Sequence, residues 1–195
     1  MLNYKYIVWL TAGCGRNIFQ KGLILMLDKK VSELLNTQVN KEFYSAYLYM
    51  DFSNYYYEMG LDGFGNWYKV QYQEERDHAI LMNQYLLNNG EHVTLDAVAK
   101  PDKIYAGVGD PMEFGLEHER YVTSLIHNIY SAANEVKDFR TMQFLDWFVK
   151  EQGEEEKNAE DLIKKFKLFG QDPKGLYMLD NELKARIYAA PSLVI

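Results

Sequence analysis

Four long segments of this chain repeat apolar residues every three to four positions, and this spacing limits the fold more than any other feature. The segments span about residues 28–59, 63–89, 110–136 and 138–168. Such spacing keeps apolar side chains on one face of an α-helix, whereas a β-strand alternates at every second residue. Strand-like alternation extends over only a few residues, and no repeat of solenoid length occurs. The sequence therefore predicts an all-α chain.

Glycines and a long irregular segment mark how the first helices should end. Gly60 and Gly90 follow the first two segments and suit the left-handed conformation that closes many helices. Residues 91–109 lose the helical spacing and contain Pro101 and two glycines. A connection of this length in a compact domain is expected to cross over along the bundle.

The second half of the chain carries its own start and stop signals. Asp110 and Pro111 predict an N-cap and a first helical residue, and Glu113 would complete a capping box. Gly170 should close the fourth helix, and a short fifth helix is expected over residues 176–188. We predict a bundle of four long helices with one crossover between the second and third helices and a short helical tail.

Each long segment carries one glutamate on its apolar stripe. Residues seven or eleven positions apart lie nearly on one line of a helix, and these positions around each glutamate are mostly apolar. Around Glu75, for example, they are Tyr68, Met82, Phe64 and Leu86. The four glutamates are Glu42, Glu75, Glu119 and Glu155. One carboxylate from each helix is therefore expected to point into the core.

A single glutamate in such a helix is usually solvated, but four on apolar stripes call for another explanation. A lone carboxylate in a core costs several kcal/mol, so converging carboxylates need a cation or shared protons. His78 lies one turn after Glu75, which lets both side chains bind one ion. Oxygen ligands with one imidazole suit iron or manganese better than a metal that prefers thiolates.

Composition narrows the function classes. The 195 residues carry a formal net charge of −7, which argues against nucleic-acid binding because that depends on basic side chains. Cys14 is the only cysteine, so an intrachain disulfide or a multi-cysteine metal site is excluded. We expect a reducing, cytoplasmic setting and no membrane association.

Residues 1–25 differ from the rest and are treated as an N-terminal extension. The apolar run at residues 7–10 is far shorter than the ~20 residues of a membrane span. Thr11-Ala-Gly-Cys14 weakly resembles a lipoprotein processing site, although Thr11 replaces the branched aliphatic residue expected there. The alternative is that Met26 is the natural start.

From residue 26 to about residue 186 the chain resembles the bacterial non-haem ferritins. The resemblance lies in Asn-Lys-Glu-Phe-Tyr-Ser at residues 40–45, Glu-Glu-Arg-Asp-His at 74–78, His118-Glu119, and Phe-Val-Lys-Glu-Gln-Gly-Glu-Glu-Glu-Lys at 148–157. It implies a ferritin-like four-helix bundle over residues 26–170, with residues 171–195 as a fifth helix and tail. It also implies a homo-oligomeric shell of 24 subunits around a mineral cavity.

The family's ligands carry over to particular residues of this chain. The resemblance implies one iron at Glu42, Glu75 and His78, and a second at Glu75, Glu119 and Glu155, with Gln152 beside it. Glu74, Glu151 and Glu154 match a third iron site, although such glutamates are often only a solvated face. Tyr49 matches a tyrosine that supplies an electron, and Trp147 matches its aromatic neighbour, although both side chains also suit core packing. The implied function is iron storage, in which Fe(II) is oxidised by dioxygen and kept as a ferric oxo-hydroxide.

Related families fit less well. Bacterioferritin needs a second Glu-x-x-His where this chain has Gln152-x-x-Glu155, and a haem-binding methionine where it has Arg76, so no haem is expected. A rubrerythrin needs several cysteines, and a DNA-protecting mini-ferritin lacks a fifth helix. A helical assembly whose buried acids only fix the register of the helices also remains open.

Overall fold

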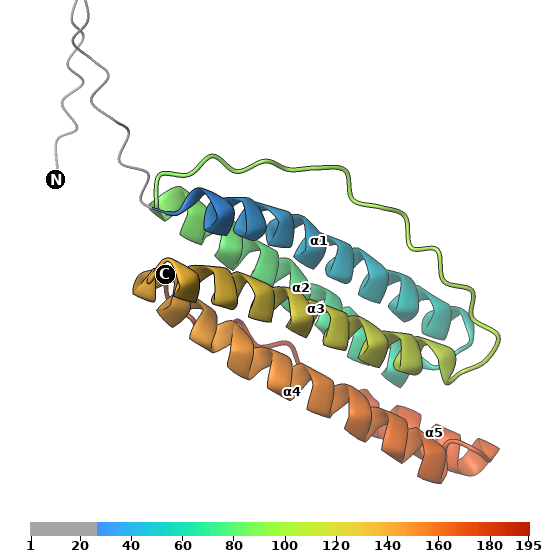
Figure 1. Cartoon of the computed structure of the whole chain (residues 1–195). Coiled ribbons are helices and arrows are strands. Elements are labelled where there is room, and N and C mark those ends of the chain that lie inside the picture. The colour runs from blue at the N-terminus through green and yellow to red at the C-terminus, as the bar shows by residue number, and fades with distance from the viewer. Residues whose placement is uncertain (1–26) are drawn as a thin grey trace, which may run out of the picture.

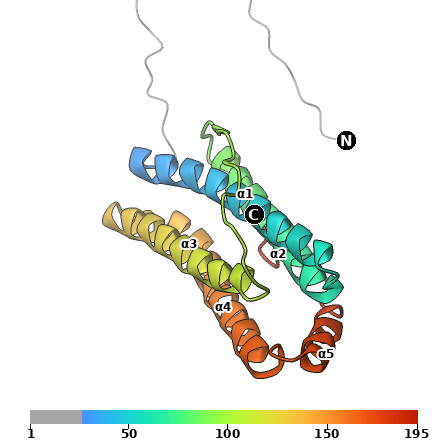
Figure 2. The ribbon, with the colours of Figure 1, turned by 90° about the vertical axis from the view of Figure 1, so that its right-hand side faces the viewer.

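The computed structural model describes residues 27–195, which form five α-helices and no strands. The predictions for residues 1–25, Cys14 included, lie outside this range. The helices, in chain order, are α1 (Lys29–Glu58), α2 (Asp62–Asn88), α3 (Asp110–Glu135), α4 (Phe139–Phe169) and α5 (Pro173–Leu183). Four long helices form two antiparallel hairpins, and α5 lies at one end of them (Figures 1 and 2). The predicted all-α bundle is confirmed.

The ends of α1 and α2 follow the sequence signals. Asp28 accepts a hydrogen bond from the backbone N–H of Lys30 and so caps the start of α1. Gly60 and Gly90 have φ values of +73° and +76°, the left-handed conformation in which glycine carries no Cβ penalty. The tight turn at Gly60 lets α2 return along α1.

The segment from residue 89 to 109 crosses over the bundle as predicted. It runs along the outside of α1 for the length of that helix (Figure 1). Asn36 and Asn40, one turn apart on α1, bind its backbone: Asn36 accepts from Thr94 N–H at 2.8 Å and Asn40 accepts from Asp96 N–H at 2.8 Å. Both amides also donate to crossover carbonyls, so two side chains satisfy four backbone groups.

Two helix starts differ from the prediction. Asp110 does not cap α3, because its carboxylate accepts from the preceding N–H groups of Ala106 and Gly107, and the helix starts without a side-chain cap. The fifth helix begins at Pro173, not at residue 176, because Asp172 caps it and proline suits its first position. It ends at Leu183, before the predicted residue 188.

Buried apolar side chains form two clusters, one toward each end of the bundle. The first includes Val31 and Leu35 of α1 and Phe144 and Phe148 of α4. The second includes residues further along α1 and α4, such as Phe52 and Leu162. The glutamates on the apolar stripes fall between the two clusters on every long helix. The core is therefore apolar at both ends and polar across its middle. Among the described residues, no helix is both long and apolar enough to cross a membrane.

Helix α5 is held to the bundle by a cap that it supplies to α2. Leu61, the N-cap residue of α2, provides no side-chain hydrogen bond. Asp180 of α5 takes that place, and its Oδ1 accepts from the N–H groups of Gly63 and Phe64 at 2.7 and 3.2 Å. A Cβ on Gly63 would lie 1.7 Å from the Asp180 carbonyl oxygen, so only glycine allows this approach.

We expect Asp180→Ala to lower the free energy of unfolding by about 1–2 kcal/mol, the usual cost of losing an N-cap. Thermal unfolding of the variant, compared with the intact chain, measures this. Asn181→Ala is the matched control, because Asn181 is exposed and bonds only within α5. An equal loss of stability in both variants would contradict the capping role of Asp180.

Candidate metal centre

The four predicted glutamates all lie in the polar middle of the core. Glu42, Glu75, Glu119 and Glu155 are 1–4% exposed, as are His78 and Gln152. They come from α1, α2, α3 and α4, one glutamate from each helix. The convergence predicted from the apolar stripes is therefore present in the structure.

One part of this layer has the geometry of a metal site. Glu42, Glu75 and His78 each offer a ligand atom, and these atoms lie within 4.8 Å of one another. His78 Nδ1 lies 3.4 Å from Glu75 Oε2. The imidazole ring makes edge contacts with Trp147 and Phe148, with ring centroids 5.5 and 5.8 Å away. These aromatic rings fix the orientation of His78.

Two carboxylate oxygens of this group lack a hydrogen-bond partner. They are Oε2 of Glu42 and Oε1 of Glu75, and both are fully buried. Gln38 donates to the other oxygen of Glu42 at 2.9 Å. Buried polar atoms without a partner are rare because each costs about 1–3 kcal/mol or more. A cation bound between these oxygens and His78 would satisfy both.

The other half of the layer is linked by hydrogen bonds. Glu119 accepts from the phenol of Tyr49 and from the Gln152 amide, the latter at 3.1 Å. Glu155 accepts from the amide of Gln71 at 2.8 Å. These donors hold the two carboxylates in place, and each carboxylate keeps acceptor capacity for a cation. Within residues 27–195, no further set of three metal-binding side chains is as close together as Glu42, Glu75 and His78.

Burial and mutual repulsion favour the protonated acids. Burial raises the pKa of Glu42 above its ordinary value, with His78 opposing the shift. The pKa of Glu75 is raised well above that value, first by burial and then by the charges of Glu119 and Glu42. Burial and the neighbouring Glu155 raise the pKa of Glu119 to about 8. A cation entering the layer must therefore displace protons.

The residues matched to a third iron site are more exposed, and two of the three, Glu74 and Glu154, are already paired. Arg186, from the tail after α5, donates to Glu74 at 2.6 Å, and both side chains are less than 20% exposed. Glu154 pairs with Lys150 of its own helix at 3.3 Å. Burial raises the pKa of Glu74 to about 7, although Arg186 opposes the shift. Burial also raises the pKa of Glu151.

Sequence reasoning missed two glutamines that position the acids. Gln38 and Gln71 are buried, and each donates to a core glutamate. A signal was present, because Gln38 and Gln71 lie four residues before Glu42 and Glu75 and so share their helix faces. Arg186 had no comparable signal, since it is 112 residues from Glu74 in sequence.

Comparison with known proteins assigns the family. Residues 32–169 match the family model described as the ferritin-like domain. A "Bacterial non-heme ferritin" of Campylobacter jejuni is 39% identical over 159 residues, which cover 82% of this chain and 95% of the relative. A protein of the same description from Staphylococcus saprophyticus is 36% identical over 84% of this chain and 98% of the relative.

A solved structure agrees with these relatives. The open-pore ferritin of Archaeoglobus fulgidus superimposes with a TM-score of 0.81 at 41% identity, covering 84% of this chain and 100% of that one. The likeness extends over nearly the whole length of each relative. The chain therefore belongs to the ferritin family.

Proposed function

We propose that this protein stores iron by binding Fe(II) in the polar middle of the bundle, oxidising it with dioxygen and depositing it as a ferric oxo-hydroxide mineral. Fe(II) is here the substrate. The observation that carries the proposal is the pair of unpartnered carboxylate oxygens on Glu42 and Glu75 beside His78. We further propose that the protein works in the cytoplasm as a homo-oligomeric shell of 24 subunits, as the family resemblance implies.

In this proposal the ligands divide between two iron ions. Glu42, Glu75 and His78 bind the first, while Glu75, Glu119 and Glu155 bind the second, so Glu75 bridges them. Gln152 holds Glu119 through its amide. Anionic oxygen ligands stabilise Fe(III) relative to Fe(II), so the set of side chains that binds the substrate also favours its oxidation.

The residues around the iron ligands accept protons and donate one electron. Acids with raised pKa values lose protons when Fe(II) binds. The partly buried Glu74 of α2 and Glu151 of α4 accept these protons. Tyr49 is fully buried and donates its phenol hydrogen bond to Glu119, one of the proposed iron ligands. Loss of one electron from Tyr49 would therefore be coupled to proton transfer along that bond.

Anaerobic titration of the intact chain with Fe(II), followed by admission of air, tests the proposal. We expect binding to saturate at two Fe(II) per subunit and both ions to be oxidised in the first rapid turnover. The contrary result is a titration curve that shows no saturation, with Fe(II) oxidised no faster than in buffer without protein. It would show that the buried acids only fix the helix register.

Arg186 pairs with Glu74, one of the proposed ligands of the third iron site, so replacing Arg186 should free that carboxylate to bind iron. We expect Arg186→Gln to bind a third Fe(II) about tenfold more tightly, since a hydrogen bond to a charged group contributes about 1.5–3 kcal/mol. The same anaerobic titration, extended beyond two ions per subunit, measures this. Arg120→Gln is the matched control, because Arg120 pairs with Glu160 at 3.1 Å on the surface of α3 and α4. Unchanged binding of the third ion in Arg186→Gln would exclude competition by this arginine.

A further inference from the structure

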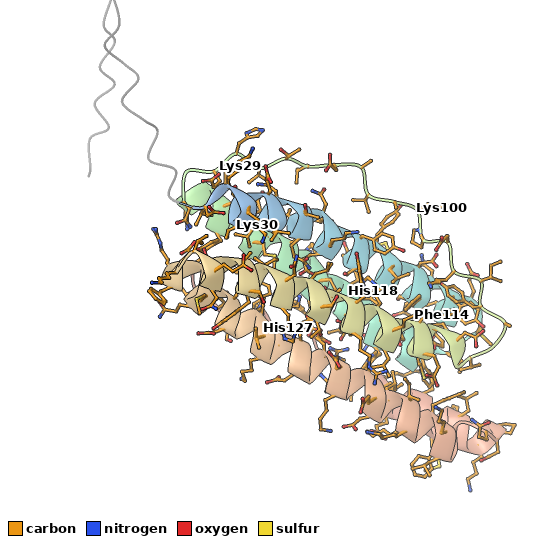
Figure 3. All side chains as sticks on the ribbon, viewed as in Figure 1. Lys29, Lys30, Lys100, Phe114, His118 and His127 are labelled. Atoms are coloured by element: carbon orange, nitrogen blue, oxygen red, sulfur yellow. The ribbon has the colours of Figure 1, made fainter. Side chains whose placement is uncertain are left out.

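A line of aromatic rings connects the polar middle of the bundle to the crossover. Tyr49 makes an edge contact with Phe52, with ring centroids 5.6 Å apart, and Phe52 makes another with Tyr105, also at 5.6 Å. Tyr105 belongs to the crossover and is only partly buried. It also contacts Phe114, which Figure 3 labels at the start of α3 next to the crossover. One intervening ring therefore separates the buried Tyr49 from a tyrosine near the surface.

The hydroxyl partners distinguish the two ends of this line from the tyrosines beside it. Tyr49 donates to the Glu119 carboxylate, and Tyr105 donates to the Asp51 carboxylate. Tyr56 and Tyr68 stack in the same cluster, but their hydroxyls donate to the backbone carbonyls of Val108 and Pro111. A carboxylate can take the phenolic proton when a tyrosine is oxidised, whereas an amide carbonyl is far too weak a base. Only the two ends of the line are equipped to become neutral radicals.

We propose that Tyr105, with Asp51 as its proton acceptor, is a secondary electron donor that restores Tyr49 after iron oxidation. This inference rests on the proposed function. Complete reduction of one dioxygen to two waters takes four electrons and four protons. The two Fe(II) ions of the buried layer supply two of the electrons, one further Fe(II) from solution supplies the third, and Tyr49 supplies the fourth. All four protons come from the acids and from solvent, because the phenolic proton of Tyr49 passes only to Glu119.

The transfer between the tyrosines conserves electrons and protons. Tyr49 first gives its electron to the iron site and its proton to Glu119. An electron then passes from Tyr105 through the contact with Phe52, the Tyr105 proton moves to Asp51, and Tyr49 recovers its proton from Glu119. The net change is a neutral radical on Tyr105 and a protonated Asp51. A one-electron reductant in solution, such as a further Fe(II), then reduces Tyr105.

This arrangement moves an oxidising group away from the side chains that bind iron. A radical left on Tyr49 would lie against Glu119 and within 6.0 Å of the ring of His118, which faces α1 and bonds to Ser45 (Figure 3). At Tyr105 the radical lies on the crossover, where a soluble reductant can reach it. A purely structural role, in which the phenol only fastens the crossover to α1, predicts none of this chemistry.

Rapid-freeze electron paramagnetic resonance after mixing the Fe(II)-loaded protein with dioxygen tests the proposal. In the intact chain we expect an early tyrosyl signal followed by a second tyrosyl signal with a different ring orientation. Tyr105→Phe should lose the second signal and prolong the first. Asp51→Asn keeps the ring and a hydrogen-bond acceptor but removes the base, and should have the same effect. Tyr130→Phe is the matched control, because Tyr130 donates to Asp146 at 3.0 Å outside this aromatic line.

The rapid phase of iron oxidation, recorded on the same samples by absorbance, separates the two proposals. If iron is oxidised rapidly but the second signal persists in Tyr105→Phe and Asp51→Asn, the role of Tyr105 is overturned while the proposed function stands. If the intact chain does not oxidise iron rapidly, both are overturned. Thermal unfolding of each variant shows whether it has folded, and Asp51→Asn provides the decisive comparison if Tyr105→Phe has not.

Discussion

Glu75→Gln is expected to abolish rapid iron oxidation and, at the same time, to stabilise the metal-free protein. Glu75 is the acid proposed to bridge both iron ions, and an amide of the same shape supplies one neutral oxygen where a carboxylate supplies two charged ones. Loss of a supporting residue around a metal typically costs 10–100-fold in activity, so loss of a bridging ligand should cost at least ~100-fold. Stopped-flow absorbance after mixing with Fe(II) and air measures the rate.

The stability of the same variant should change in the opposite direction. Glu75 is 1% exposed, one of its oxygens has no partner, and burial with the charges of Glu119 and Glu42 raises its pKa well above the ordinary value. The metal-free protein must therefore either bury a repelled charge or take up a proton. A glutamine avoids both, so we expect the free energy of unfolding near neutral pH to rise by on the order of 1 kcal/mol.

Glu58→Gln provides the control, because Glu58 is exposed at the end of α1. This variant should retain the oxidation rate and the stability of the intact chain. A Glu75→Gln protein that is less stable without metal would show that the carboxylate contributes to folding. A Glu75→Gln protein that oxidises iron at the normal rate would remove Glu75 from the proposed site.

The bundle could be predicted from the sequence because its signals are local. Apolar spacing identified four helices. Gly60 and Gly90 marked the ends of the first two through a backbone conformation that favours glycine. The start of α5 was predicted at residue 176, three residues too late, because the cap at Asp172 makes Pro173 the first helical residue. The cap at Asp110 was wrong because its carboxylate turned back to the crossover, a competition that the helix pattern does not show.

The inward acids could also be predicted, because their place on an apolar stripe is visible in the local sequence. Burying a carboxylate there is costly, so its presence indicates a function. Their partners were harder to foresee. Gln38 and Gln71 share a helix face with the acids, but the bond from Gln71 reaches Glu155 on another helix, which requires the packing of α2 against the rest of the bundle. The pairing of Arg186 with Glu74 depends on the path of the tail after α5, for which the sequence holds no periodic signal.

A redox-inert divalent ion should stabilise the protein, and more strongly as the pH rises. With zinc at a hundred times its dissociation constant, binding to the folded state alone contributes about 2.7 kcal/mol. A chain of this size gains about 2–4 °C in Tm per kcal/mol, so we expect the Tm to rise by about 5–10 °C. Differential scanning calorimetry with and without zinc, at a series of pH values, measures the shift.

The pH dependence follows from the direction of the pKa shifts. An acid whose pKa is higher in the folded state than in the unfolded chain favours folding below its ordinary pKa, and this contribution is lost as the pH rises through the folded value. For Glu119 that interval runs from 4.5 to about 8, and for Glu74 from 4.5 to about 7. The metal-free protein should therefore lose stability between about pH 5 and pH 8.

Zinc binds the deprotonated acids, so it competes with protons at low pH and offsets the repulsion between carboxylates at high pH. The zinc-dependent increase in Tm should thus be small near pH 5 and largest near pH 8. Glu75→Gln, which removes the bridging acid and much of the repulsion, should show little zinc dependence at any pH. An increase that is the same at all pH values, or that persists in Glu75→Gln, would place the bound zinc outside the buried layer and leave its carboxylates with a structural role only.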